Sequence, residues 1–159
     1  MEKTNLEKEY SKYKTKYSLS DFNSLDKEFE LSNVNLENVN EKFLLDVIRR
    51  RMSEKLIFVC NNLQAVLMPN PGVIVSIKQN NFFDEVEKEN ISKLLSHMMI
   101  FERRSASLEI ESKEEENAKF IKEFYQDWND NKDKIKKIFE KLIKGWESSE
   151  KKEKVQYFG

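Results

Sequence analysis

An apolar stripe in the middle of the chain constrains the fold more than any other feature. Its residues recur at intervals of three or four: Leu45, Ile48, Met52, Leu56, Val59, Leu63 and Val66. This spacing places all the side chains on one face of an α-helix and does not fit the two-residue period of a strand. Asn38 and Glu41 have the spacing of a capping box, and Pro69–Gly72 ends the pattern. We therefore predict a long amphipathic helix from Asn38 to Met68.

The second half of the sequence carries two more stripes of this kind. Apolar residues recur at helical intervals from Ile91 to Leu108 and again from Ala118 to Trp146. Acidic residues stand before each stripe, where they suit the positive end of a helix dipole. The patterns predict helices over Asp84–Glu111 and Glu114–Trp146.

The remaining segments predict shorter elements. A thin helical stripe over Asn5–Tyr17 predicts one short helix, and a second is expected to begin after Ser20. Val73–Ile77 has the composition of a strand. No second strand is available to pair with it, and a lone strand leaves backbone groups unsatisfied. We predict a short helix or a packed loop there.

The composition supports the same fold class. The 159 residues include only three glycines and two prolines, too few for the turns of a sheet of short strands. We predict an all-α fold: an elongated antiparallel bundle of three long helices, with two short N-terminal helices packed across it. The predicted organisation is an N-terminal helical arm over 1–37, the bundle core over 38–147 and a frayed, charged tail over 148–159.

Charge and cysteine content limit the classes of partner and compartment. The 28 basic side chains nearly balance the 29 acidic ones, so no global field attracts nucleic acid or an anionic membrane. Cys60 is the single cysteine and excludes an internal disulfide, as in a reducing compartment. No apolar run reaches the roughly 18 residues of a membrane span, and the N-terminus lacks a signal-peptide core. These features predict a cytoplasmic protein.

Motifs for catalysis and cofactors fail on inspection. The run Asp127–Asp133 resembles a calcium loop, but lysine stands where the turn needs glycine. His97 is the only histidine, which excludes a paired Glu-x-x-His di-iron site and a His-rich zinc site. Three widely spaced glycines form no phosphate loop. Cys60 and His97 lie on or beside apolar stripes and are interpreted as packing residues, so we predict no catalytic residue, metal or cofactor.

Two groups of basic residues form the candidate binding surface. The first contains all five arginines: Arg49, Arg50, Arg51, Arg103 and Arg104. The second contains four lysines at three- or four-residue spacing: Lys134, Lys137, Lys141 and Lys144. Both groups have a plainer interpretation. The arginines would pair with acids of neighbouring helices, and the lysines would coat the outer face of a bundle helix.

Three segments carry a family resemblance: Leu25–Leu31, Phe83–Ile91 and Phe120–Trp128. They resemble segments of an uncharacterised family of small all-helical archaeal proteins, and the resemblance extends over most of the chain. It implies a helical fold. The family has no known activity, so no functional residue is carried over.

Three functional hypotheses follow. The favoured one is a non-enzymatic helical interaction or adaptor protein that binds a protein partner or a second copy of itself. The second is an RNA- or ribosome-associated factor that contacts phosphates through the basic groups. The third is an enzyme with a carboxylate-based site, which would need a polar pocket lined by carboxylates of raised pKa.

Overall fold

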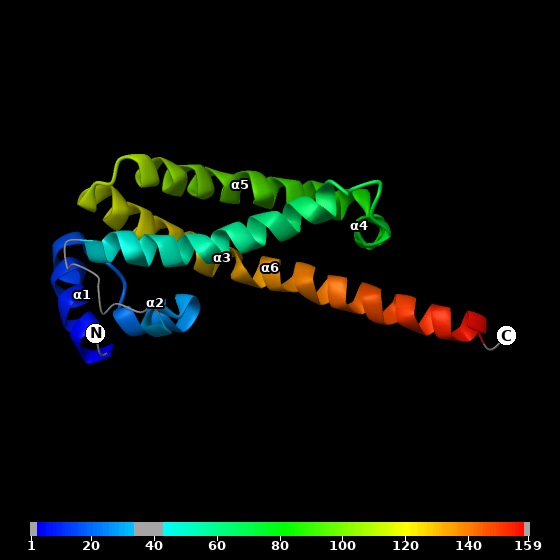
Figure 1. Cartoon of the computed structure of the whole chain (residues 1–159), viewed down its shortest axis with the longest axis horizontal. Coiled ribbons are helices and arrows are strands. Elements are labelled where there is room, and N and C mark those ends of the chain that lie inside the picture. Colours follow the sequence, from blue (N-terminus) through cyan, green and yellow to red (C-terminus); the bar gives the residue numbers. More distant parts are fainter. Residues whose placement is uncertain (1–2, 34–42, 158–159) are drawn as a thin grey trace. The chain divides into compact units, whose positions relative to one another are not determined.

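The chain is all-α over the residues that the computed structural model describes, 3–33 and 43–157. These residues form six α-helices and one 3₁₀ helix, without a strand (Figure 1). The elements are α1 (Lys3–Tyr17), α2 (Phe22–Phe29), η1 (Leu31–Asn33), α3 (Leu44–Leu67), α4 (Ile74–Asn81), α5 (Glu85–Ile110) and α6 (Glu114–Tyr157). The predicted fold class is confirmed.

The helix bounds can be compared with the predicted ones at three places. Asn38 and Glu41, the predicted capping box, lie outside the described residues, and α3 is described from Leu44. The strand-like run at 73–77 belongs mostly to α4, a short helix, which is one of the two predicted outcomes. The prediction of a frayed tail after 147 is wrong for secondary structure, because α6 continues to Tyr157. The added segment is rich in Lys and Glu, which are good helix formers, and has no proline to stop it.

The described chain groups into two compact units. Unit 1 comprises Met1–Phe58 and Met98–Trp128, and unit 2 comprises Val59–His97 and Asn129–Gly159. Each of the three long helices contributes one part to each unit. The predicted division into arm, core and tail follows other boundaries and stays a prediction.

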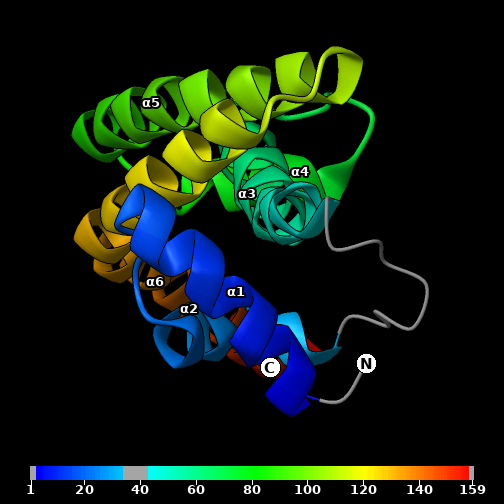
Figure 2. The same cartoon turned by 90° about the vertical axis from the view of Figure 1, so that its left-hand side faces the viewer.

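An aromatic cluster forms the centre of unit 1. Phe124 lies 6.0 Å from Phe29, 5.4 Å from Phe101 and 5.6 Å from Phe120 between ring centroids. Trp128 extends the cluster and donates its indole N–H to Glu28 at 2.8 Å. These contacts fasten α2 to the first part of α6 (Figure 2). The apolar face of α2 thus belongs to the core of unit 1.

The core of unit 2 joins the remaining parts of the long helices. The buried apolar side chains that α3, α5 and α6 supply to it include Val59, Leu63, Val66, Ile91, Leu94, Ile135 and Leu142. Asp84 and Glu87 cap the start of α5 reciprocally, since each carboxylate accepts the other residue's backbone N–H at 2.9 Å. This box marks the residue at which α5 begins.

Gly145 allows the segment after α4 to approach α6 closely. A Cβ at this position would lie 2.4 Å from Cδ2 of Phe82, whose ring packs edge-to-face on Trp146 at 5.5 Å. Within a helix, glycine is ordinarily less favourable than alanine. Its presence here is explained by the space that the Phe82 ring occupies.

We predict that Gly145→Ala and Phe82→Ala are strongly coupled. In the Phe82→Ala background, Gly145→Ala should stabilise the protein by about 0.5–1 kcal/mol, because the helix gains alanine and nothing clashes. In the wild-type background it should be destabilising. A double-mutant cycle of denaturant unfolding measures the difference. An equal effect in both backgrounds would contradict this explanation of the glycine.

Within the described residues, none of the helices is both long enough and apolar enough to cross a bilayer.

Candidate functional site

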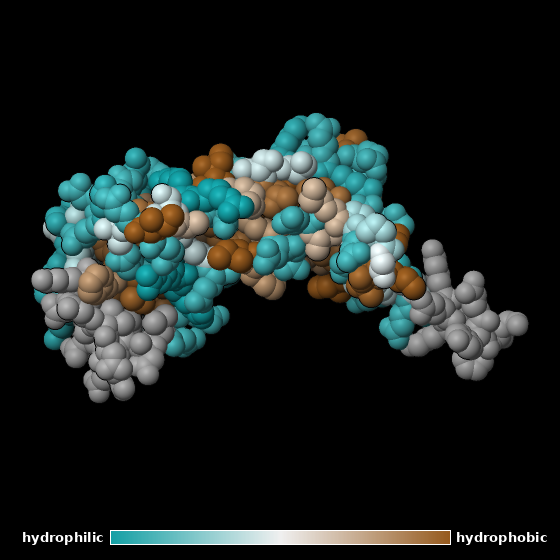
Figure 3. Space-filling model, turned by 45° about the horizontal axis from the view of Figure 1, so that its top comes forward, coloured by the Kyte–Doolittle hydropathy of each residue, from teal (hydrophilic) through white to brown (hydrophobic). Residues whose placement is uncertain are grey.

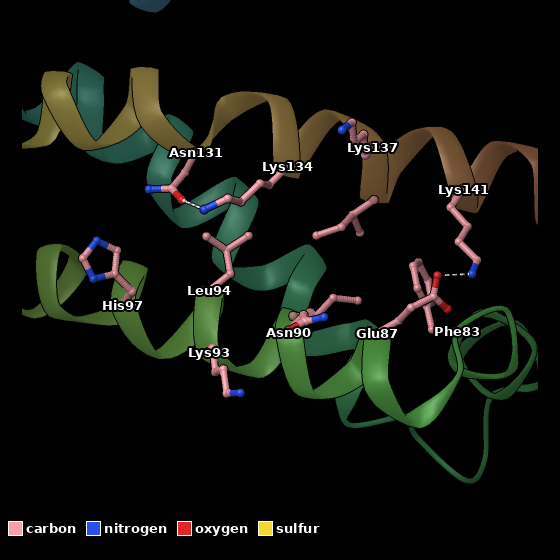
Figure 4. Close-up of a pocket in the computed structure, with 12 residues that line it drawn as sticks. Phe83, Glu87, Asn90, Lys93, Leu94, His97, Asn131, Lys134, Lys137 and Lys141 are labelled. Atoms are coloured by element: carbon pink, nitrogen blue, oxygen red, sulfur yellow. Dashed lines mark hydrogen bonds and ion pairs between the residues drawn. The ribbon is translucent and has the colours of Figure 1, made fainter.

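A groove of about 680 Å³ lies between α5 and α6 in unit 2, and we call it the α5–α6 groove (Figure 4). Phe83 lines it just before α5 begins. The lining from α5 consists of Glu87, Asn90, Ile91, Lys93, Leu94 and His97. The lining from α6 consists of Asn131, Lys134, Lys137, Ile138 and Lys141. All of these residues belong to the same unit.

Helical periodicity explains why these residues share one groove. On α5 they recur at intervals of three and four, as in Glu87, Asn90 and Leu94. On α6 the same intervals separate Asn131, Lys134 and Ile138. Side chains at this spacing lie on one helix face, so each helix presents a single mixed stripe to the groove.

The groove has an apolar floor beneath a basic rim. Ile91 and Leu94 are buried, whereas Lys134 and Lys137 are exposed. Four lysines line the groove against one carboxylate, that of Glu87. Its local charge is therefore positive although the whole chain is close to neutral. Such a groove attracts a ligand that combines apolar groups with negative charge.

Glu87 is already engaged by the protein. It forms an ion pair with Lys141 across the groove, drawn as a dashed line in Figure 4, and it caps α5 through Asp84. The neighbouring Lys141 ammonium, followed by the backbone hydrogen bond from Asp84, lowers the pKa of this carboxylate below its ordinary value. Glu87 is thus ionised at neutral pH and holds one end of the groove together.

The opposite end of the groove is organised by Asn131. Its Oδ1 accepts a hydrogen bond from the Lys134 ammonium at 3.0 Å, and the residue is buried. Leu94 of α5 and Lys134 of α6 point into the same gap, while Lys93 points away from it (Figure 4). Lys134 is therefore aimed along the groove, and Lys93 contributes to its outer edge.

Of the predicted arginine group, Arg49 lies inside unit 1. Its side chain is fully buried and donates to Asn117 Oδ1 at 2.7 Å, to Ser105 Oγ at 2.8 Å and to Glu109 at 2.6 Å. Asp46 lies 3.6 Å away and accepts from Asn117 at 3.2 Å. Arg49 joins α3, α5 and α6 in a buried polar network and does not lie on a surface.

The other arginines are also paired with acidic side chains. Arg50 binds Glu109 at 2.9 Å, and Arg104 binds Glu123 at 2.7 Å. The Arg50 guanidinium is the main cause of the lowered pKa of Glu109. Two further pairs lie within single helices, Arg51 with Glu54 at 2.5 Å and Arg103 with Glu102 at 3.1 Å. The structure does not gather the five arginines into one patch.

The lysine group is brought together. Lys134, Lys137 and Lys141 line the α5–α6 groove, and Lys144 joins Lys137 and Lys141 around a neighbouring cavity of about 480 Å³. Lys134, Lys137 and Lys144 are exposed, and Lys141 is half-buried beside Glu87. That these lysines form a binding surface stays a prediction.

Sequence reasoning missed the α5 half of the groove. The spacing of Glu87, Asn90, Leu94 and His97 was available as a signal, since the stripe mixes charged, polar and apolar groups. A stripe that only packs in a core is more uniformly apolar. What the sequence could not supply was the register that sets this stripe opposite Asn131–Lys141.

The described residues do not provide a set of metal ligands or of groove carboxylates. Over residues 3–33 and 43–157, no group of three or more His, Cys, Asp or Glu side chains is placed to hold a metal ion. The hypothesis of an enzyme with a carboxylate-based site requires a pocket lined by several carboxylates of raised pKa. The groove lining instead contains one carboxylate, Glu87, and its pKa is lowered.

Comparisons with protein-family models, curated proteins and solved structures gave no match to this chain.

Proposed function

We propose that the protein is a non-enzymatic adaptor whose α5–α6 groove binds an acidic amphipathic helix of a partner protein. The observation that carries the proposal is that the exposed Lys134 and Lys137 line the same groove as the buried Ile91 and Leu94. Apolar anchors of the partner would bury against the floor, and its Asp or Glu side chains would meet the lysines. This is the helix-in-groove mode of recognition.

The dimensions of the groove suit a short helix. Its α5 side extends from Glu87 to His97, which at 1.5 Å per residue is about 15 Å. Three turns of a partner helix cover this length and present anchors at positions i, i+3 or i+4, and i+7. A third helix laid between two others also buries its stripe by ordinary helix packing.

Apolar contact favours a peptide over nucleic acid as the occupant. RNA held through its phosphates needs cations but gains nothing from Leu94, Ile91 or Ile138 beneath them. The alternative of an RNA-associated factor remains a proposal of lower rank, supported by the same lysines alone.

The finer fold prediction, an antiparallel bundle of three long helices with the N-terminal helices across it, is also retained as a proposal. It is supported by the three-residue connection between Ile110 and Glu114, since short loops join antiparallel neighbours.

The proposal is tested with a designed 18-residue helix carrying leucines at i, i+3, i+7 and glutamates on both flanks. We expect fluorescence anisotropy to give a dissociation constant on the order of 10 µM that weakens with added salt. Lys134→Glu/Lys137→Glu should raise it by at least about tenfold, because two attractive charges become repulsive.

Lys119→Glu/Lys122→Glu is the matched control, with the same helix, spacing and charge change but positions in unit 1. It should leave the affinity within about twofold, apart from the shared effect of net charge. An equal loss of peptide affinity in the two variants would contradict the proposal. So would equal binding of a peptide with lysines in place of the glutamates. If an RNA oligonucleotide binds more tightly than the peptide, and this binding is lost in Lys134→Glu/Lys137→Glu, the RNA-associated function would replace the adaptor function.

A further inference from the structure

Helix α4 leaves its apolar residues exposed to solvent. Its apolar residues face outward: Ile74 is 73% exposed, Val75 52% and Ile77 39%, and the preceding Val73 is 43% exposed. None of its residues is buried. We call Val73, Ile74, Val75 and Ile77 the α4 patch. Figure 3 shows, on the face drawn, that apolar surface interrupts the hydrophilic surface of the protein.

Polar side chains occupy the inner face of α4. Asn80 donates to the Val66 carbonyl at 2.8 Å, and the Ser76 hydroxyl accepts the Asn70 N–H at 2.8 Å. Ser76, Gln79 and Asn80 are all half-buried. The helix is therefore held to unit 2 by hydrogen bonds, and these bonds fix its apolar face outward.

An outward apolar face on a short helix leaves hydrophobic area in water. Fully burying a valine or isoleucine side chain is ordinarily worth about 1.5–3 kcal/mol, and part of that gain is unused here. Contiguous exposed apolar residues of this kind mark interaction sites on soluble proteins.

The charges around α4 point to another copy of the same chain. From Met68 to Phe83 the only charged residue is Lys78, so two such surfaces meet with little repulsion. Asp84 and Glu85 follow directly, so groups opposite in sign to Lys78 flank the patch. A surface with both features is complementary to itself, as a twofold interface requires. We propose that the α4 patch is a homotypic interface through which the protein dimerises.

A membrane surface fits the same patch less well. Interfacial helices carry Lys or Arg on their polar face, where these contact anionic headgroups. The polar face of α4 carries Ser76, Gln79 and Asn80 and is turned into unit 2. The acidic residues at the start of α5 would in addition repel an anionic leaflet.

The size of the patch sets the strength of the dimer. A stable interface uses roughly 20–30 residues on each side, far more than the four apolar residues here. We therefore expect a weak, reversible dimer with a dissociation constant on the order of 100 µM.

Sedimentation equilibrium of the full chain from about 10 µM to 1 mM tests the interface. Ile74→Ser/Ile77→Ser should raise the dimer dissociation constant at least about tenfold. Its helical content and unfolding transition should be unchanged, because both side chains are exposed. Ile110→Ser is the control, an isoleucine that is 90% exposed on α5 in unit 1. It should dimerise as the wild type does.

A wild-type chain that stays monomeric up to 1 mM would overturn the proposal. Equal weakening by Ile110→Ser would do the same, since any exposed isoleucine would then suffice. Co-sedimentation of the monomer with zwitterionic or anionic vesicles, lost in Ile74→Ser/Ile77→Ser, would assign the patch to a lipid surface instead. The α5–α6 groove is intact in these variants, so peptide binding reports on it separately.

Discussion

Arg49→Met should lower the free energy of unfolding by about 3–5 kcal/mol. The guanidinium is fully buried and supplies hydrogen bonds to Asn117, Ser105 and Glu109. Methionine fills a similar volume but donates nothing. The substitution leaves the buried Asp46 without its nearby cation and the Asn117 carbonyl without its donor. Removing one member of a buried charged network costs this much because the remaining polar groups stay buried without a hydrogen-bond partner or water.

Arg50→Met provides the matched comparison. Arg50 is the next residue of α3 and binds the same Glu109, yet its side chain is 58% exposed. Water solvates both groups when that pair is broken, so the loss should stay below about 1 kcal/mol. Urea unfolding followed by circular dichroism measures both variants. Similar losses in the two would contradict the assignment of the Arg49 network as an internal support of unit 1.

Phe124→Ala should destabilise the protein by about 3–5 kcal/mol. Phe124 is completely buried and contacts the rings of Phe29, Phe101, Phe120 and Trp128. Truncation removes its transfer free energy and leaves a cavity among rings that can relax only in part. Because Phe29 anchors α2 through this cluster, we also expect faster amide exchange in α2.

The matched control is Phe43→Ala, the same truncation at a phenylalanine that is 56% exposed. Its cost should remain within about 1 kcal/mol. A small loss for Phe124→Ala, or unchanged exchange in α2, would show that the cluster does not hold α2 against α6.

Much of the secondary structure follows from local patterns. In stripes such as Leu45–Val66 the apolar residues recur every three or four positions, which fits a helix and does not fit a strand. Helix ends were less predictable, because a charged segment after Gly145 is compatible with a tail or with a continued helix. The outcome there depends on propensity summed over many residues. For Val73–Ile77, only the lack of a partner strand pointed to the helix that forms.

The groove was half predictable. Lys134, Lys137 and Lys141 were identified as a basic stripe, but nothing in their spacing shows which helix lies beside them. Arg49 illustrates the same limit, since three consecutive arginines look equivalent in the sequence. Their environments differ because successive residues turn by about 100° around the helix, which buries Arg49 and exposes Arg50. In both cases tertiary contacts decide the environment of each side chain.

The two proposed surfaces have a joint consequence. A dimer formed through the α4 patch carries two α5–α6 grooves, and a partner with two acidic helices would bind it with avidity. Ile74→Ser/Ile77→Ser should then weaken binding of a tandem peptide while leaving the single peptide unaffected.

The most direct test of the central claim is an amide NMR titration of the full chain with the acidic 18-residue helix. We predict that the largest shift changes fall within 83–97 and 131–141, the two sides of the α5–α6 groove. In Lys134→Glu/Lys137→Glu they should need at least about tenfold more peptide to reach the same size. Shift changes concentrated in α4 or in unit 1, with 83–97 and 131–141 unaffected, would contradict the assignment of the groove as the binding site.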